Sequence, residues 1–439
     1  MYRKNIYDKD LLYSFLRMVW VDGPIRHSYR KVEVHGQDRL PDTGAIILAP
    51  NHCNTLMDAL VILRSDAAPT IFGARADMFR KPLFAKAMYF FRILPMVRQR
   101  DGLRNVLQNN KTQEIIVETL ENDARFCIFP EGKHRAMHSL QALGKGLARI
   151  AYSANERFGA EKPVYVVPVG IEYGDYFRYR STSLVNYGEA VNITEFLRDN
   201  HFENEAQAID AIRRKISEKI PELITYIPDN EEYEAKWALL KMCSIFKKKK
   251  GYGDFGTSLY KSMLENRKIA ESIERLSEKN PEKAAEIFTR ASEFDRERRK
   301  AGISIYSFRK MCPKCNAIGK GLAALVGLPY FIVSAVLSLP IWALALKIRS
   351  GVKDPAFGNT VSFGVRLVLA PILFLIYAIL AFCLAPWWAA TALLLIFLTS
   401  YSYFHDYIEG CRRWFSDIRL MKNRNLYKEF KSIVKDFRD

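Results

Sequence analysis

Two long apolar segments set the strongest limit on how this chain of 439 residues can fold. Residues 319–346 and 367–404 are almost free of charged side chains. A helix of about 20 apolar residues is long enough to span a bilayer. We therefore expect an integral membrane protein whose apolar segments lie in the lipid.

The charges around these segments restrict the topology. Three full crossings would place the basic C-terminal tail, residues 409–439, on the opposite side of the membrane from the N-terminal half of the chain. Basic segments favour the cytoplasmic side, so an even number of crossings is expected. Within a membrane region over 316–408, we expect a re-entrant segment over 319–346 followed by a hairpin of two spans, 367–385 and 386–404. Two prolines, Pro329 and Pro340, are expected to break the re-entrant segment.

The net charge of +18 indicates an anionic partner. Nucleic acid, an anionic membrane surface and a phosphorylated substrate all qualify, and the apolar segments favour the last two. The seven cysteines are scattered, which suits a reducing compartment. Cys312 and Cys315 have the spacing of metal ligands, but no second Cys or His pair lies nearby in sequence. Because a zinc site needs about four ligands, no metal site is predicted.

Residues 26–195 alternate between strand and helix patterns, which predicts an α/β domain with a mixed sheet flanked by helices. Apolar or alternating runs predict strands over 31–34, 45–48, 70–74, 125–129 and 164–171. Helical periodicity appears over 81–92, 103–121 and 140–158.

The remaining segments are predicted to be helical. Residues 8–25, within an N-terminal region over 1–25, form an amphipathic helix that either lies in the membrane interface or packs on the domain. From 196 to 315 the chain is rich in Glu, Lys, Arg, Ala and Leu, which predicts several solvated helices without an evident function.

A histidine and a carboxylate follow the strand over 45–48. His52 comes at the mouth of this strand, and Asp58 follows six residues later. If His52 lies in the turn and Asp58 in the first turns of the next helix, the two form a general base and its orienting partner. Asn51 or Asn54 is expected to cap that helix.

Polar residues also follow two other predicted strands. Arg98 and Arg100 come shortly after Pro95, where their guanidinium groups can bind phosphate oxygens. Glu131 and Gly132 end the strand over 125–129, and glycine there permits close backbone approach to a ligand. Open α/β sheets usually place their sites at such strand ends.

The order of these residues resembles the four sequence blocks of the glycerophospholipid acyltransferases. The blocks are Asn51-His52 with Asp58, then Leu94-Pro95-Met96-Val97-Arg98, then Phe129-Pro130-Glu131-Gly132, then Val167-Pro168-Val169. The resemblance covers about residues 25–195. Two features depart from the family pattern: five residues instead of four separate His52 from Asp58, and Lys133 replaces the threonine usual after the Glu-Gly pair.

The five-residue spacing is similar to that of the fungal-type glycerol-3-phosphate/dihydroxyacetone-phosphate acyltransferases. A lead-in like residues 30–36, a long helical middle and a basic segment like residues 347–353 between apolar spans also occur in that subgroup. This similarity favours glycerol 3-phosphate as the acceptor over its monoacyl form.

The resemblance implies a membrane-bound O-acyltransferase of phospholipid biosynthesis. His52 would act as the general base on the acceptor hydroxyl, and Asp58 would orient its imidazole. Glu131 and Gly132 would complete the acceptor pocket, and Pro168 would shape the acyl-donor side. Arg98 would bind the acceptor phosphate, with help from Arg100 and Lys133.

The implied acyl donor is an acyl-CoA or acyl-carrier-protein thioester, without a metal or other cofactor and without nucleic acid. The domain is expected on the cytoplasmic side. Two alternatives stay open: a 1-acylglycerol-3-phosphate (lysophosphatidate) acyltransferase, and a catalytically inactive membrane scaffold or binding protein.

Overall fold

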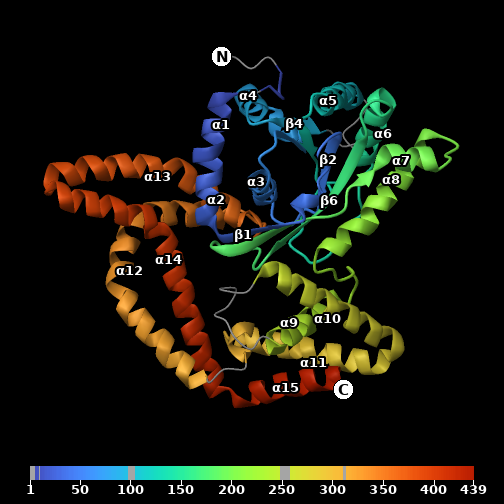
Figure 1. Ribbon diagram of the computed structural model, residues 1–439. Helices are drawn as coiled ribbons and strands as arrows, with labels where there is room; N and C mark the ends of the chain where they lie inside the picture. Colours follow the sequence, from blue (N-terminus) through green and yellow to red (C-terminus); the bar gives the residue numbers. More distant parts are fainter. Residues whose placement is uncertain (1–4, 9, 97–103, 248–257, 310–312) are drawn as a thin grey trace. The chain divides into compact units, whose positions relative to one another are not determined.

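The computed structural model describes residues 5–8, 10–96, 104–247, 258–309 and 313–439. The chain divides into two compact units. Unit 1 comprises Met1–Arg26, Lys31–Tyr176 and Ser183–Ile224, and unit 2 comprises His27–Arg30, Phe177–Thr182 and Thr225–Asp439. Figure 1 labels the helices and strands of the two units.

The described residues form one mixed sheet of eight strands in the order β1-β7-β6-β2-β5-β3-β4, with β8 paired to β6. Parallel pairs join β2 to β5 and β6, and β3 to β4 and β5. β7 and β8 run antiparallel to β6. The strands are β1 (Tyr29–His35), β2 (Ala45–Pro50), β3 (Thr70–Arg75), β4 (Ile93–Met96), β5 (Arg125–Cys127), β6 (Val164–Tyr173), β7 (Ser181–Tyr187) and β8 (Val191–Asn192).

The strands at the centre of the sheet are continuous apolar runs. Every residue of β2 is buried. A parallel strand covered on both faces has no solvent-facing side, so its sequence does not alternate between apolar and polar residues. The register pairs Ala49 of β2 with Pro168 of β6, directly before the loop that carries His52. The predicted strands over 31–34, 45–48, 70–74, 125–129 and 164–171 are confirmed, whereas β4, β7 and β8 had no clear sequence signal.

Three helices cover one face of the sheet around a single core (Figure 1). These helices are α5 (Arg104–Glu121), α6 (Gly146–Phe158) and α8 (Glu205–Lys219). Ile116, Ala151 and Ile212, one from each helix, are buried in the same apolar cluster as Phe126 of β5. The other helical segments of unit 1 are η2 (Gln37–Arg39), α3 (Leu56–Ser65), η3 (Ala76–Phe79), α4 (Pro82–Phe90), α7 (Ile193–Asp199) and η5 (Ile220–Leu223).

The N-terminal helix is divided into α1 (Leu11–Leu16), a π-helical turn η1 (Arg17–Asp22) and α2 (Gly23–Ser28). Tyr13 is buried and packs edge-on against Phe90 of α4, with the Arg92 guanidinium over its ring. Leu11 and Phe15 remain exposed. One side of this segment therefore packs on the domain, and its other apolar side chains face outward.

Gly170 of β6 lies where the chain after α8 crosses close to the sheet. A Cβ at this position would lie 2.7 Å from the Leu223 Cβ and would collide with the Leu223 backbone carbonyl. Replacing Gly170 with alanine is therefore expected to destabilise the domain by about 1–3 kcal/mol, as overpacking of a filled core does. Thermal unfolding in detergent measures the loss as a lower midpoint.

The control for that experiment is Gly146→Ala at the start of α6. A Cβ there would meet only the Ile128 Cδ1, at 3.9 Å, and alanine is a better helix former than glycine. Equal midpoints for Gly170→Ala and wild type would show that the close approach at Leu223 is not a packing constraint.

Unit 2 is helical beyond Thr225. Its helices outside the apolar segments are α9 (Tyr233–Lys247), α10 (Leu259–Lys279), α11 (Pro281–Lys300) and α15 (Arg424–Arg438), with the turn η6 (Ile305–Phe308). The prediction of solvated helices is wrong for α9, which is largely buried. Phe294, Phe308 and Phe430 pack together with edge-on and tilted rings where α11, η6 and α15 meet. The helical stretch predicted over 196–315 is thus shared, since α7, α8 and η5 belong to unit 1.

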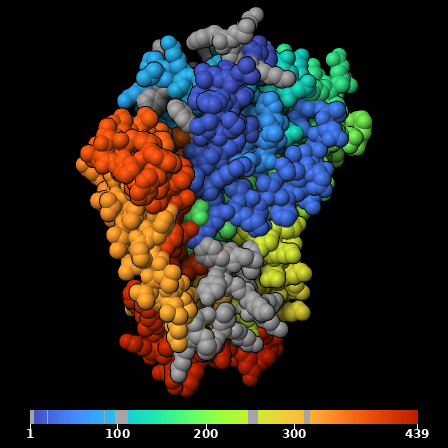
Figure 2. Space-filling model, turned by 60° about the vertical axis from the view of Figure 1, so that its left-hand side comes forward, coloured from blue at the N-terminus to red at the C-terminus, as the bar shows by residue number. Residues whose placement is uncertain are grey.

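Three helices of unit 2 are long and apolar enough to cross a membrane, among the residues described. They are α12 (Pro313–Ser350), α13 (Phe357–Leu384) and α14 (Trp387–Lys422). Many apolar side chains of α12 and α13 are exposed, and both helices lie at the surface in orange in Figure 2. Such exposure without a lipid phase would be costly, which indicates membrane association.

The expectation that two prolines break the first apolar segment is wrong, because the helix is not interrupted at either proline. α12 continues through Pro329 and Pro340 as one helix, although it follows a curved path in Figure 1. A proline removes one N–H donor and bends a helix, and neighbouring helices can support the bend. Here the hydroxyls of Tyr403 and Tyr407 on α14 donate to the carbonyls of Gly327 and Ala324, at 3.1 and 2.8 Å.

Candidate active site

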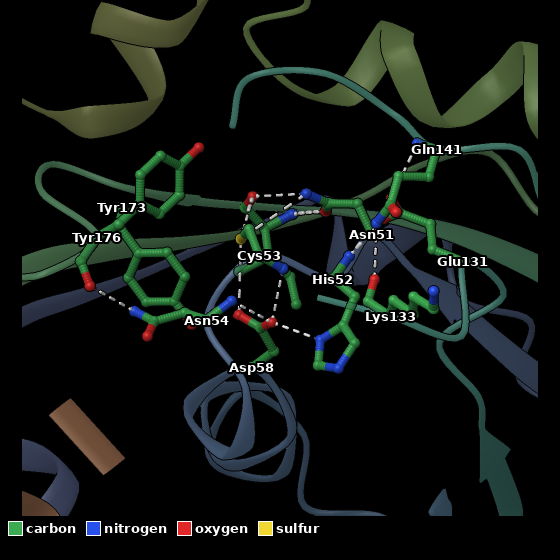
Figure 3. Close-up of polar contacts among 11 residues, drawn as sticks. Asn51, His52, Cys53, Asn54, Asp58, Glu131, Lys133, Gln141, Tyr173 and Tyr176 are labelled. Carbon is green, nitrogen blue, oxygen red and sulfur yellow. Dashed lines mark hydrogen bonds and ion pairs between the residues drawn. The ribbon is translucent and has the colours of Figure 1, made fainter. Parts of the chain in front are cut away.

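His52 and Asp58 form a hydrogen-bonded pair at the carboxyl end of β2. His52 lies in the loop after the strand, and Asp58 lies in the first turn of α3. The His52 Nδ1 is 2.7 Å from the Asp58 Oδ2 (Figure 3). A carboxylate at this distance favours the tautomer with a proton on Nδ1, which leaves a lone pair on Nε2.

The Asp58 carboxylate is fully buried and well supplied with donors. Its Oδ2 also accepts the backbone N–H groups of Cys53 and Asn54, at 2.8 and 2.6 Å. Its Oδ1 accepts the hydroxyl of Tyr173, at 2.8 Å (Figure 3). These donors replace the hydrogen bonds that the buried carboxylate would otherwise make with water.

Tyr173 was not predicted from the sequence. It ends β6, the strand next to β2, and so reaches the same end of the sheet as the His52 loop. Its one sequence signal is its position at the end of an apolar run, because Tyr173 and Asp58 are 115 positions apart in the chain and no local pattern links them.

Two asparagines fix the loop rather than capping α3, so the predicted cap is wrong. The Asn51 amide accepts the Ile171 N–H at 2.6 Å and donates to the Ile171 carbonyl at 3.1 Å. The Asn54 Nδ2 donates to the Tyr176 carbonyl at 3.1 Å. The residue at the N-cap is Thr55, at φ 49°, and it makes no side-chain capping bond. Both amides are thus used to tie the loop to β6 and the segment after it.

Aromatic rings hold the outer side of His52. The Phe129 ring stacks on the imidazole with centroids 4.3 Å apart, and the His134 ring meets it edge-on at 5.6 Å. The His52 side chain is 17% exposed, whereas Asp58 is buried. The imidazole is therefore held on one face and at Nδ1, and part of its surface is accessible to a substrate.

The side-chain contacts of Glu131 were not predicted from the sequence. Its Oε1 accepts the backbone N–H of His52 at 2.7 Å, and its Oε2 accepts the N–H and Nε2 of Gln141 at 2.9 and 3.2 Å (Figure 3). Burial raises the pKa of Glu131, and these donors oppose that shift. The Glu131 carboxylate thus joins the His52 loop to the segment after β5.

Gly132 and Lys133 follow Glu131 in the same turn. Gly132 has a φ of +67°, a conformation that favours glycine. The Lys133 carbonyl accepts the Gln141 Nε2 at 2.7 Å, and its side chain is exposed. Pro168 lies on β6 beside Ala49, and its carbonyl accepts the N–H of Gly188 at 2.9 Å.

Arg98 and Arg100 lie outside the described residues, so their predicted role in phosphate binding stays a prediction. Among the residues that are described, no group of three or more His, Cys, Asp or Glu side chains is arranged to hold a metal ion.

Comparisons with known proteins identify the domain. Residues 31–172 match the Acyltransferase family model, a range that contains His52, Asp58 and Glu131. A solved structure described as the 1-acyl-sn-glycerophosphate (LPA) acyltransferase PlsC from Thermotoga maritima matches with 19% identity and a TM-score of 0.35. That match covers 49% of this chain and 80% of the other. A comparison with curated protein sequences gave no match. Residues 31–172 are therefore the part of the chain that matches an acyltransferase domain.

Proposed function

We propose that the protein transfers a fatty acyl group from an acyl thioester to the sn-1 hydroxyl of glycerol 3-phosphate, in phospholipid biosynthesis. The observation that carries the proposal is the 2.7 Å contact between His52 Nδ1 and a buried Asp58, within the acyltransferase domain. A histidine oriented in this way presents Nε2 as a base.

The reaction follows from this geometry. The His52 Nε2 removes the proton of the acceptor hydroxyl while the oxygen attacks the thioester carbonyl. The tetrahedral intermediate then expels the thiolate, which takes the proton back from His52. Asp58 stabilises the imidazolium that forms between the two steps. The acyl group passes directly to the acceptor, without a covalent intermediate on the protein.

Glu131 has a positioning role in this proposal. Its carboxylate receives the His52 N–H and the Gln141 N–H, so it holds two loops of the site in register. Preorganisation of this kind matters because a displacement of about 1 Å can cost about 10²-fold in rate. Gly132 and the exposed Lys133 then border the acceptor pocket.

The acceptor phosphate is assigned to Arg98, with Arg100 and Lys133 as further cations. The sequence blocks support this assignment, since an arginine follows Leu94-Pro95-Met96-Val97 in the family pattern. A guanidinium binds phosphate oxygens through two parallel hydrogen bonds. Pro168 is assigned to the acyl-donor side.

We assign glycerol 3-phosphate as the acceptor because two sequence features resemble enzymes that use it. These are the five residues between His52 and Asp58 and the lead-in at residues 30–36. The test compares glycerol 3-phosphate with 1-acylglycerol 3-phosphate at equal donor concentration, using purified protein in detergent. We expect a higher kcat/KM for glycerol 3-phosphate. The reverse order would identify a lysophosphatidate acyltransferase, and transfer to neither acceptor would favour an inactive scaffold.

A membrane setting suits this reaction because the acyl chain and the acylated product are both apolar. By the same proposal the acyltransferase domain faces the cytoplasm, where basic segments concentrate. The donor is an acyl-CoA or an acyl-carrier protein, and no metal is required.

Tyr173→Phe is expected to lower kcat by about 10–100-fold with little change in KM. The substitution removes one hydrogen bond to the charged Asp58, and such bonds contribute about 1.5–3 kcal/mol. Tyr176→Phe is the matched control, because the Asn54 amide contacts the Tyr176 backbone carbonyl and not its hydroxyl. An unchanged kcat in Tyr173→Phe would show that the hydroxyl does not support the His52–Asp58 pair.

A further inference from the structure

Unit 2 gathers arginines where the α13–α14 hairpin meets a strand and loop from the N-terminal half of the chain. We call Arg30, Arg178, Arg180, Arg366 and Arg413 the hairpin-base cluster. Arg30 is on β1, Arg178 and Arg180 are on the segment before β7, Arg366 is on α13, and Arg413 is on α14. All five belong to unit 2.

Two carboxylates of α14 form ion pairs with four of these arginines. The Nη2 atoms of Arg30 and Arg180 lie 2.7 and 2.9 Å from the carboxylate of Asp406. Arg178 and Arg413 share the Oε1 of Glu409, at 2.9 and 2.7 Å. Among the described residues, each of these two carboxylates is thus shared by two guanidinium groups, and the five arginines of the cluster have an excess of positive charge over them.

Arg366 contributes most clearly to that excess. Its Nη1 donates to the hydroxyl of Tyr179 at 2.9 Å, and its guanidinium lies 5.5 Å from the Tyr401 ring centroid. These partners position the guanidinium without neutralising its charge. Burial, together with the charges of Arg366 and Arg180, lowers the pKa of nearby His27 to about 4, and the two arginine contributions reflect the local positive field.

The cluster lies at a specific depth along the hairpin. Arg366 precedes the end of α13 at Leu384 by 18 residues, and Asp406 follows the start of α14 at Trp387 by 19 residues. At 1.5 Å per residue, both separations are about 27–29 Å, close to the thickness of a bilayer's hydrocarbon core.

The side chains between these ends fit a membrane. Trp387 and Trp388 at the hairpin tip are 74% and 63% exposed, and tryptophans favour the interface of a bilayer. The large exposed side chains below the tip are apolar: Val368, Ile372, Leu375, Ile376, Ile379, Leu380, Phe382, Leu395 and Leu398. With the tip at one interface, the arginines stand at the level of the phosphates of the other.

We infer that the hairpin-base cluster binds the phosphate of an anionic membrane phospholipid. A guanidinium is weakly hydrated and matches phosphate oxygens in a planar fork, which suits a partly buried interfacial site. An ionisable side chain within a membrane segment is also costly in free energy, and those that occur commonly mark a functional site. The inferred ligand is distinct from the acyl acceptor, so the site is independent of the proposed reaction.

The test measures lipid binding without turnover. Purified full-length protein in neutral detergent is titrated with phosphatidylglycerol, phosphatidylcholine or inorganic phosphate, and bound lipid is counted by native mass spectrometry. We expect phosphatidylglycerol to bind at least tenfold more tightly than phosphatidylcholine. Inorganic phosphate at the same concentration should not displace it. Displacement by phosphate at that concentration would overturn the lipid assignment.

Variants connect the binding to the cluster. Arg366→Gln is expected to weaken phosphatidylglycerol binding at least tenfold, and Arg366→Lys less, since lysine keeps the charge but not the fork. Arg275→Gln removes the same charge from an exposed site on α10 and should leave binding unchanged. Equal losses of binding in Arg366→Gln and Arg275→Gln would show that binding depends only on the net charge of the protein, and would refute the site.

A second variant keeps the inference testable if Arg366→Gln unfolds. Tyr179→Phe removes the hydrogen bond that positions Arg366 while it leaves every charge in place. We expect binding to weaken severalfold at an unchanged thermal midpoint. Unaltered binding in Tyr179→Phe, together with Arg366→Lys equal to wild type, would contradict a positioned guanidinium.

Discussion

Replacing His52 with alanine is expected to lower the rate of acyl transfer by about 10²–10⁴-fold, the usual contribution of a positioned general base. The structure holds His52 through both its side chain and its backbone. Asp58 holds its Nδ1, Phe129 packs on its face, and Glu131 accepts its backbone N–H. Loss of the ring removes the proton acceptor and leaves the loop contacts of Asp58 and Glu131 in place.

The effect of His52→Ala should appear in kcat rather than in binding of the acceptor. The measurement is steady-state transfer at saturating donor, with the thermal midpoint as a check on folding. His201→Ala is the matched control, since His201 lies exposed in the loop after α7. Equal losses in both variants would point to a general effect of the substitution and not to a base at position 52.

Asp58→Asn is expected to produce the second large loss, about 10²–10⁴-fold in kcat. An amide cannot match the four donors that meet at Asp58, since one of its two ends is itself a donor. It also cannot stabilise the imidazolium or select the tautomer with a proton on Nδ1. The same amide faces the N–H groups of Cys53 and Asn54, so a lower thermal midpoint is expected as well.

The two expected effects of Asp58→Asn are separated when kcat is measured at a folded fraction matched to that of wild type. Asp199→Asn, which changes an exposed carboxylate at the end of α7, is the control. A kcat equal to that of wild type at matched folded fraction would contradict a direct role of Asp58 on the His52 imidazole.

The sequence was most informative where chemistry and local pattern coincide. Continuous apolar runs located β2 and β6 because buried parallel strands need no polar face. The pair His52 and Asp58 was predictable because both residues lie on one loop and helix start. Long apolar runs likewise located the candidate membrane helices α12, α13 and α14.

Long-range contacts account for what the sequence did not reveal. Tyr173 meets Asp58 only because β6 lies beside β2 in the sheet. Glu131 was assigned to the acceptor pocket by the family resemblance, and its contacts with the backbone donors of His52 and Gln141 from two loops were not predicted. α12 passes through Pro329, and Tyr403 of α14 donates a hydrogen bond to the Gly327 carbonyl nearby, a contact that no local propensity encodes.

The most direct test of the central claim is a single assay of acyl transfer. Purified wild-type protein and His52→Ala, matched in folded fraction, are supplied with a thioester donor and glycerol 3-phosphate, and the acylated product is quantified by mass spectrometry. The account predicts 1-acylglycerol 3-phosphate from the wild type and a rate about 10²–10⁴-fold lower from the variant. Absence of transfer by the wild type to any glycerol-phosphate acceptor, or an equal rate from His52→Ala, would contradict it.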